Sequence, residues 1–263
     1  MKIPFYKCNG NGNSFIIIIH NNTLKNSLFK KKNIQKICLY EKNKIADGLV
    51  VINIKNNKIY MDYYNNDGTW ETLCLNGLRC SALLLNKILN ENNINIYCND
   101  YLYETFILNN NMVEVKLKKP IYKTKNIKIE GFIGDYIDVG AKHFVILYNN
   151  EWPSLEELEN IAKKIRYNKF VFPDGININF YKILNNMKIQ VKTYEKGVES
   201  MMLSCASGSY ASAFHYMEEN NLSGCLHVLN DGGDFHISFD ENYINNTLAG
   251  KTEIEYKDFI ELN

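Results

Sequence analysis

The sequence predicts an α+β protein built from two pseudo-twofold-related domains, each a curved, mostly antiparallel sheet wrapped around a central helix. Three observations support this prediction. The 263 residues, 46% hydrophobic and 22% charged, have an ordinary globular composition and suffice for one large domain or two of about 130 residues each. Local patterns of the first half recur in the second half in the same order. Each half also contains strand-sized segments and one helix that is apolar almost all round, which is typical of a buried helix.

The internal duplication rests on four pairs of patterns that recur at a nearly constant separation of 127 to 131 positions. The most specific is the motif Cys-x-x-Gly-x-x-x-Ser-Ala, which begins at Cys74 and again at Cys205. The other pairs are residues 13–17 with 142–146, 47–48 with 174–175, and 58–64 with 187–194. Four pairs in register rarely arise by chance, so the duplication predicts two similar halves.

In the first half, β-branched runs of strand length predict strands at 15–20, 48–54, 58–64, 94–98 and 112–117. The segment 27–44 is expected to form a surface helix. The segment 77–89 (GLRCSALLLNKIL) is expected to be the central helix of this half, because it is apolar almost all round.

In the second half, strands are expected at 176–180 and 187–194, a surface helix at 155–166 and the central helix at 208–219. The lysine-rich stretch 118–126 is the expected linker. The domains are therefore predicted as 1–120 and 121–263, and the sequence leaves open that the last strand returns to the first domain.

Charge and hydropathy exclude several classes of protein. A formal net charge of +1 supplies no long-range field for binding nucleic acid or an anionic membrane. No run of about 18 apolar residues is present, and the N-terminal segment lacks an apolar signal core. Lysine is abundant and arginine occurs only at Arg79 and Arg166, which a coding bias explains. We expect a soluble cytoplasmic protein with a small-molecule partner; whether it forms a homodimer is left open.

Seven cysteines, an odd number with no CxxC spacing, argue against a disulfide framework or a structural zinc site, so no metal is expected. Most of these cysteines should be small buried side chains without chemical function. This expectation covers Cys8, Cys38, Cys80, Cys98 and Cys225.

Cys74 and Cys205 differ from the others because each stands directly before a predicted central helix. Unpaired N–H groups and the helix dipole make a helix N-terminus a site that stabilises a thiolate and binds a carboxylate. In a pseudo-twofold molecule the two helix starts can face each other across a cleft. One thiolate would then remove a proton from a carbon while the other thiol returns one from the opposite side, which inverts the stereocentre without a cofactor.

The motifs resemble those of the diaminopimelate epimerases, within the wider pyridoxal-phosphate-independent amino-acid racemase superfamily, over nearly the whole chain. In the first half, GNGNSF at 10–15, ADGLV at 46–50, and NNDG at 65–68 with CLNGLRC at 74–80 are similar to the family's GxGNDF, ADGLV and NADG…CGNGxRC. In the second half, GAKH at 140–143, GININF at 175–180, YEKGVE at 194–199 and CASG at 205–208 are similar to GxPH, GxNVNF, YERGVE and CGTG or CGSG.

The resemblance implies a diaminopimelate-epimerase-like fold and an isomerase that inverts LL- or meso-diaminopimelate. It implies that Cys74 and Cys205 are the acid/base pair, assisted by Glu195 and His143. It further implies two kinds of substrate contact, made by side chains and by backbone N–H groups around the helix starts. The implied contacts are Asn13, Asn65, Asn76, Gly77, Asn177, Lys196, Ser207 and Gly208.

Several positions depart from the family pattern, mostly where the far end of the substrate would bind. Lys196 replaces an arginine that clamps the distal carboxylate, so a planar fork becomes a point charge. Ala141 and Lys142 replace the Asn-Pro of the family's GNPH, and Leu75 and Ala206 replace the glycines after the cysteines. A racemase of another free amino acid, histidine first, is therefore an alternative.

Two further alternatives stay open. Leu75 and Ala206 could obstruct the site, which would make the chain a non-catalytic amino-acid-binding relative. A dithiol redox protein could use the same two cysteines, although these lack a CxxC spacing.

Overall fold

The computed structural model describes residues 2–20, 29–40, 45–109 and 111–262, which divide into two compact units. Unit 1 comprises residues up to Lys116 and those from Gly250 onward, and unit 2 comprises Leu117–Ala249. The boundary lies before the expected residue 120, and the last strand contributes mainly to unit 1. None of the described helices is long and apolar enough to cross a membrane.

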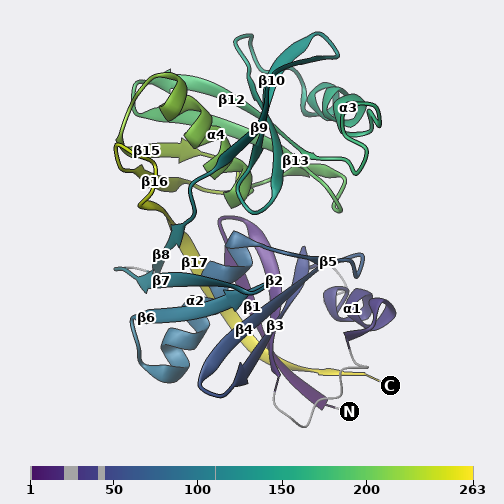
Figure 1. The fold of residues 1–263 in the computed structure, drawn as a ribbon. Coiled ribbons are helices and arrows are strands. Elements are labelled where there is room, and N and C mark those ends of the chain that lie inside the picture. The colour runs from purple at the N-terminus through teal and green to yellow at the C-terminus, as the bar shows by residue number, and fades with distance from the viewer. Residues whose placement is uncertain (1, 21–28, 41–44, 110, 263) are drawn as a thin grey trace. The chain divides into compact units, whose positions relative to one another are not determined.

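In unit 1, strands surround the helix α2 (Leu75–Leu89), which contacts β1, β2, β3, β6 and β7 (Figure 1). The strands are β1 (Lys2–Gly10), β2 (Asn13–His20), β3 (Gly48–Lys55), β4 (Lys58–Asn65), β5 (Trp70–Glu71), β6 (Asn93–Cys98), β7 (Tyr101–Ile107), β8 (Met112–Leu117) and β17 (Asn246–Glu261). Pairing runs from β1 through β2, β3, β4, β6, β7 and β8 to β17, which pairs with β1. These eight described strands therefore close into a barrel.

Unit 2 repeats this plan around α4 (Ala206–Glu219), which contacts β11, β12, β13, β15 and β16. Its strands are β9 (Ile121–Ile129), β10 (Phe132–Asp138), β11 (Lys142–Leu147), β12 (Asn177–Asn185), β13 (Lys188–Glu195), β14 (Ser200–Met202), β15 (Gly224–Leu229) and β16 (Phe235–Phe239). The pairs β11–β12 and β13–β15 are parallel, whereas β10–β11, β12–β13 and β15–β16 are antiparallel. The corresponding pairs of unit 1 have the same directions, so the duplication extends to strand pairing. The α+β class, with curved, mostly antiparallel sheets around central helices, is confirmed.

Both predicted central helices are present, and each begins two residues earlier than predicted. The backbone of Cys74 is extended at φ −131° and its side chain caps the helix, so α2 begins at Leu75. Every residue of α2 from Leu75 to Leu85 is buried, as its apolar circumference predicts. α2 ends at Leu89, and its C-cap residue, Asn90, adopts the left-handed conformation common at helix C-termini.

The outer helices are amphipathic and cover the outside of each sheet (Figure 1). α3 (Leu155–Arg166) has the predicted bounds because Ser154 and Glu157 form a capping box at its start. α1 (Lys31–Cys38) is shorter than the predicted 27–44: its N-cap residue, Lys30, makes no side-chain capping hydrogen bond, and the helix ends before Leu39. Residues 27–28 and 41–44 of that prediction lie outside the described residues.

The expected linker at 118–126 is wrong, because β9 occupies most of it and pairs with β10. Most side chains of β9 are exposed or half-buried, so its sequence lacks the apolar alternation that marks a strand. The boundary between the units therefore lies within the last residues of β8.

Candidate active site

Cys74 and Cys205 occupy equivalent positions at the starts of α2 and α4. Their φ and ψ angles are −131° and 103° at Cys74, and −134° and 110° at Cys205. In both, the Sγ accepts the backbone N–H three residues later, from Gly77 or Gly208, at 3.4 Å. The duplicated motif thus produces two helices that each begin with a thiol.

The surroundings of the two thiols differ. Cys74 is half-buried, whereas Cys205 is buried and lies 3.4 Å from the Ser207 hydroxyl. Burial and the nearby Glu195 carboxylate raise the pKa of the Cys205 thiol to about 12, although Ser207 and Gly208 donate to the sulfur. At this site desolvation outweighs the stabilisation of a thiolate by the helix start, so Cys205 is a thiol at neutral pH.

In unit 1, the structure brings two of the predicted substrate contacts together. Asn76 Nδ2 donates to Asn13 Oδ1 at 3.3 Å, and Asn13 Nδ2 donates to Asp47 Oδ2 at 2.6 Å. Burial raises the pKa of Asp47, against the hydrogen bonds from Ser14 and Asn13. Asp47 lies in the ADGLV motif, yet sequence reasoning assigned it no role.

Asn65, the remaining predicted contact of unit 1, is buried at the end of β4. Its Nδ2 donates to the Thr69 hydroxyl at 3.1 Å within the turn that follows. In this structure Asn65 shapes the chain between β4 and the Cys74 helix, and its contact with substrate stays a prediction.

In unit 2, His143 lies fully buried on β11 and its Nδ1 accepts from Asn179 Nδ2 at 3.0 Å. The ring proton therefore resides on Nε2, for which the described residues offer no hydrogen-bond acceptor. Burial lowers the pKa of His143 to about 4, so the imidazole is neutral at pH 7.

Asn179 is a residue that sequence reasoning missed. Its Oδ1 accepts from the Thr193 hydroxyl at 2.9 Å, and a Cβ on Gly208 would lie 2.2 Å from that same oxygen. Gly208 is therefore required for space at the helix start. The alternation of side chains along β12 could have indicated Asn179, because it shares a face with Asn177.

Asn177 connects two backbone segments of unit 2. Its Nδ2 donates to the Lys142 carbonyl at 2.9 Å, and its Oδ1 accepts the Lys196 N–H at 2.8 Å. Asn177 therefore fixes the main chain beside Glu195, and any contact with substrate stays a prediction. The Lys142 Nζ lies 3.8 Å from the Asp174 carboxylate on the exposed surface.

The other cysteines are mostly as expected. Cys8, Cys38, Cys80 and Cys98 are buried, but the expectation for Cys225 is wrong because its side chain is exposed. On β15 the alternation of side chains buries Leu226 and Val228 and turns Cys225 outward.

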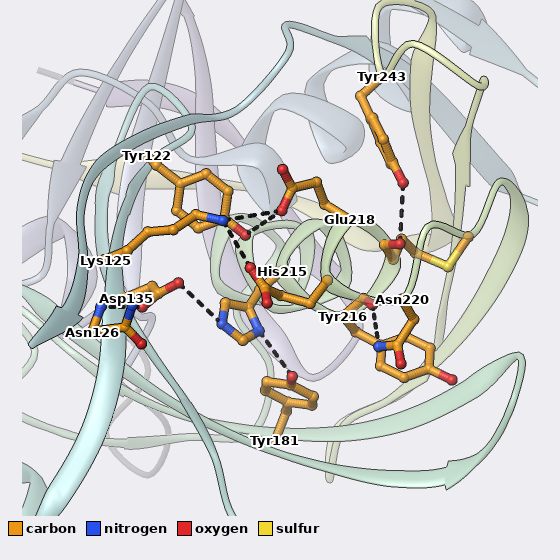
Figure 2. Close-up of polar contacts among 12 residues, drawn as sticks. Tyr122, Lys125, Asn126, Asp135, Tyr181, His215, Tyr216, Glu218, Asn220 and Tyr243 are labelled. Carbon is orange, nitrogen blue, oxygen red and sulfur yellow. Dashed lines mark hydrogen bonds and ion pairs between the residues drawn. The ribbon is translucent and has the colours of Figure 1, made fainter.

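A second polar cluster, which the sequence did not indicate, lies along the second half of α4 (Figure 2). His215 Nδ1 lies 2.9 Å from the Tyr181 hydroxyl, and Asp135 Oδ2 lies 3.4 Å from His215 Nε2. Lys125 contacts both Glu218 and Glu219. These contacts link β9, β10 and β12 to α4 and hold the helix that begins at Cys205.

Comparison with known proteins identifies relatives of this chain by fold and by sequence. No family model matches the chain. A probable proline racemase from Agrobacterium radiobacter K84 and a hydroxyproline epimerase from Agrobacterium vitis share the fold, each with a TM-score of 0.78, at 11% and 10% identity. Each comparison covers 99% of this chain and 93% of the other.

Curated relatives are closer in sequence. A diaminopimelate epimerase of Flavobacterium psychrophilum is 30% identical over 266 residues, covering 97% of this chain and 99% of the relative. One from Buchnera aphidicola is 32% identical, covering 89% and 90%. The chain is therefore an isomerase of amino acids. It belongs to the diaminopimelate epimerase family.

Proposed function

We propose that the chain inverts a Cα stereocentre of diaminopimelate, interconverting the LL and meso forms without a cofactor, with Cys74 and Cys205 as the two bases. The observation that carries the proposal is the matched geometry of the two thiols, each capping the start of a central helix at 3.4 Å from a glycine N–H. Relatives named diaminopimelate epimerase support the choice of substrate.

The reaction requires one thiolate and one thiol on opposite faces of the substrate. The thiolate takes the α-proton and becomes a thiol, while the other thiol protonates the carbanion from the opposite side and becomes a thiolate. No net proton is consumed, and the pair is ready for the reverse reaction. Backbone N–H groups at Asn76-Gly77 and Ser207-Gly208 would hold the α-carboxylate, on which the carbanion charge develops.

The difference in burial supports an assignment of roles in the resting enzyme. Cys205 is buried beside Glu195 and holds its proton, so it serves as the first acid. Cys74, which is half-buried, serves as the first base. His143 is neutral at pH 7, so it would assist the reaction as a hydrogen-bond donor through its Nε2–H and not as a positive charge.

The far end of the substrate would be held by Lys196. Asn177 fixes the Lys196 backbone N–H at 2.8 Å, so the start of this side chain is fixed even though the family's arginine is absent. Two positions favour the alternative, a racemase of another free amino acid, histidine first. Lys196 lacks the planar fork of the family's arginine, and Ala141 lacks the side-chain amide of the family's asparagine, both of which recognise a carboxylate.

A substrate panel tests the proposal. The protein is incubated in D₂O with LL-diaminopimelate and with individual free L-amino acids, including histidine; α-deuterium incorporation and chiral chromatography report turnover. Deuterium incorporation and inversion specific to diaminopimelate support the proposal. Turnover of histidine alone would instead establish the alternative, and ligand-induced thermal stabilisation with no exchange would indicate a binding protein.

A further inference from the structure

The two arginines of the chain occupy special positions. Of 30 basic residues only Arg79 and Arg166 are arginine, and a coding bias explains the scarcity but not the two places where arginine remains. Both side chains are buried. Arg79 belongs to α2, the helix that Cys74 caps, and Arg166 contacts Glu199 in the loop that follows Glu195 and Lys196.

Arg79 begins a directional chain of hydrogen bonds in unit 1. Its Nη2 donates to Asn76 Oδ1 at 2.6 Å, and its Nη1 donates to Asn11 Oδ1 at 3.2 Å and to the Lys251 carbonyl at 3.1 Å. From Asn76 the chain continues through Asn13 to the Asp47 carboxylate.

The guanidinium at one end of this chain and the carboxylate at the other fix the orientation of the Asn76 and Asn13 side-chain amides. Arg79 can only donate, so Asn76 presents its oxygen to the guanidinium and its nitrogen to Asn13. Asp47 can only accept when ionised, so Asn13 presents its nitrogen to the carboxylate. Arg79 and Asp47 thereby orient two of the predicted substrate contacts.

Arg166 plays the corresponding part in unit 2. Its Nη2 lies 2.7 Å from Glu199 Oε1, which also accepts the Gly197 N–H at 3.0 Å. The Glu199 N–H in turn donates to the Glu195 carbonyl at 2.8 Å, which closes the loop behind Glu195. The guanidinium packs over Gly175, where a Cβ would lie 1.3 Å from Nη1.

Lysine would not replace arginine at either place. The fork of Arg79 reaches three acceptors at once, whereas an ammonium is a point charge on a flexible stem. Burial lowers the pKa of Arg79 to about 10, which leaves the guanidinium charged at pH 7. A buried lysine starts from an ordinary pKa of about 10.4 and would lose much of its charge.

We propose that Arg79 and Arg166 are positioning residues for the epimerase reaction, Arg79 orienting the Asn76 and Asn13 amides and Arg166 holding the Glu195–Glu199 loop through Glu199. The effects on kinetics that this inference predicts rest on the proposed function.

The test compares Arg79→Lys and Arg166→Lys with wild type by steady-state kinetics and by backbone hydrogen exchange. Arg79→Lys should raise KM roughly tenfold, because oriented amides bind substrate, and Arg166→Lys should lower kcat roughly tenfold, because Glu195 lies beside Cys205. Amide exchange should rise at residues 195–199 in Arg166→Lys and at the start of α2 in Arg79→Lys. Lys116→Gln, which breaks an exposed ion pair with Glu104, is the control and should change neither readout.

Rescue separates positioning from general destabilisation. Millimolar guanidinium should restore part of the activity of Arg166→Gly, whereas a merely structural defect would persist. If Arg79→Lys fails to fold, Asp47→Asn tests the other end of the chain and should also raise KM. Lysine variants with wild-type kinetics and wild-type exchange would overturn the inference. A wild-type protein inactive on every amino acid would refute the proposed function, and hydrogen exchange would then decide the positioning by itself.

Discussion

The starts of α2 and α4 have the same backbone and different surroundings. Their capping cysteines agree within several degrees in φ and ψ, and both sulfurs accept a glycine N–H at 3.4 Å. The Cys74 side adjoins a chain of amides that ends in charged groups, whereas the Cys205 side is buried against a network of His143, Asn179 and Thr193. Duplication supplies two equivalent helix starts, and the side chains that pack around them bury Cys205 more deeply than Cys74, which raises the pKa of the Cys205 thiol.

The strongest test of this comparison replaces each thiol. Cys74→Ser and Cys205→Ser should each lower the rate of inversion by about a thousandfold, since general acid–base groups contribute about 10²–10⁴-fold. α-Hydrogen exchange in D₂O measures the loss for each substitution. A double variant that still inverts its substrate would disprove the two-thiol mechanism.

Methyl groups added at Gly77 and Gly208, the glycines three residues after the capping cysteines, should have unequal effects. Gly208→Ala is expected to destabilise the protein by about 3 kcal/mol, because its Cβ would lie 2.2 Å from Asn179 Oδ1 in a packed interior. At Gly77 the nearest atom is Val50 Cγ2 at 3.1 Å, and the gain in helix propensity of about 1 kcal/mol offsets the contact. Urea unfolding compares the two variants; equal losses would contradict the asymmetry.

Low pH should lower the free energy of unfolding, because the buried His143 in unit 2 resists protonation. Its pKa is about 4 in the folded protein, against an ordinary value of about 6.5 in the unfolded chain. The unfolded chain therefore binds the proton first, and stability that is complete above pH 6.5 falls as the pH drops towards 4. The loss at pH 5 is about 2 kcal/mol relative to pH 8.

The same pH series on His143→Gln provides the measurement. This variant keeps a polar side chain but has no titrating ring, so the difference in unfolding free energy between pH 8 and pH 5 should shrink by about that amount. An unchanged difference would mean that His143 does not titrate as its burial requires.

The smallest effect is expected at Thr193, whose hydroxyl donates to Asn179 Oδ1. Thr193→Val removes one buried hydrogen bond and should cost about 1 kcal/mol. Thr69→Val, which removes the partner of the Asn65 amide in unit 1, is the matched comparison. Urea unfolding of both variants shows whether the two networks contribute equally.

Local signals predicted the scaffold well. The Cys-x-x-Gly motif, the apolar circumference of 77–89 and the capping residues of 155–166 act within one or two turns, so they place α2, α3 and α4 within two residues. The lysine-rich sequence of β9 predicts a linker and not a strand, because its lysines are solvated in the fold and leave no alternating pattern.

The sequence by itself determined the duplication, the α+β class and the two thiols at helix starts, because each of these is read from short local patterns, which for the duplication recur in the second half of the chain. Only the tertiary structure decided the partners across the sheets. Asn179 meets Gly208, Arg79 meets Asn11 and Asp47 meets Asn13 from 29 to 68 positions away, and the burial that raises the pKa of Cys205 comes from packing. Contacts of that range are set by strand pairing and by the volume around a helix, which no local pattern of residues encodes.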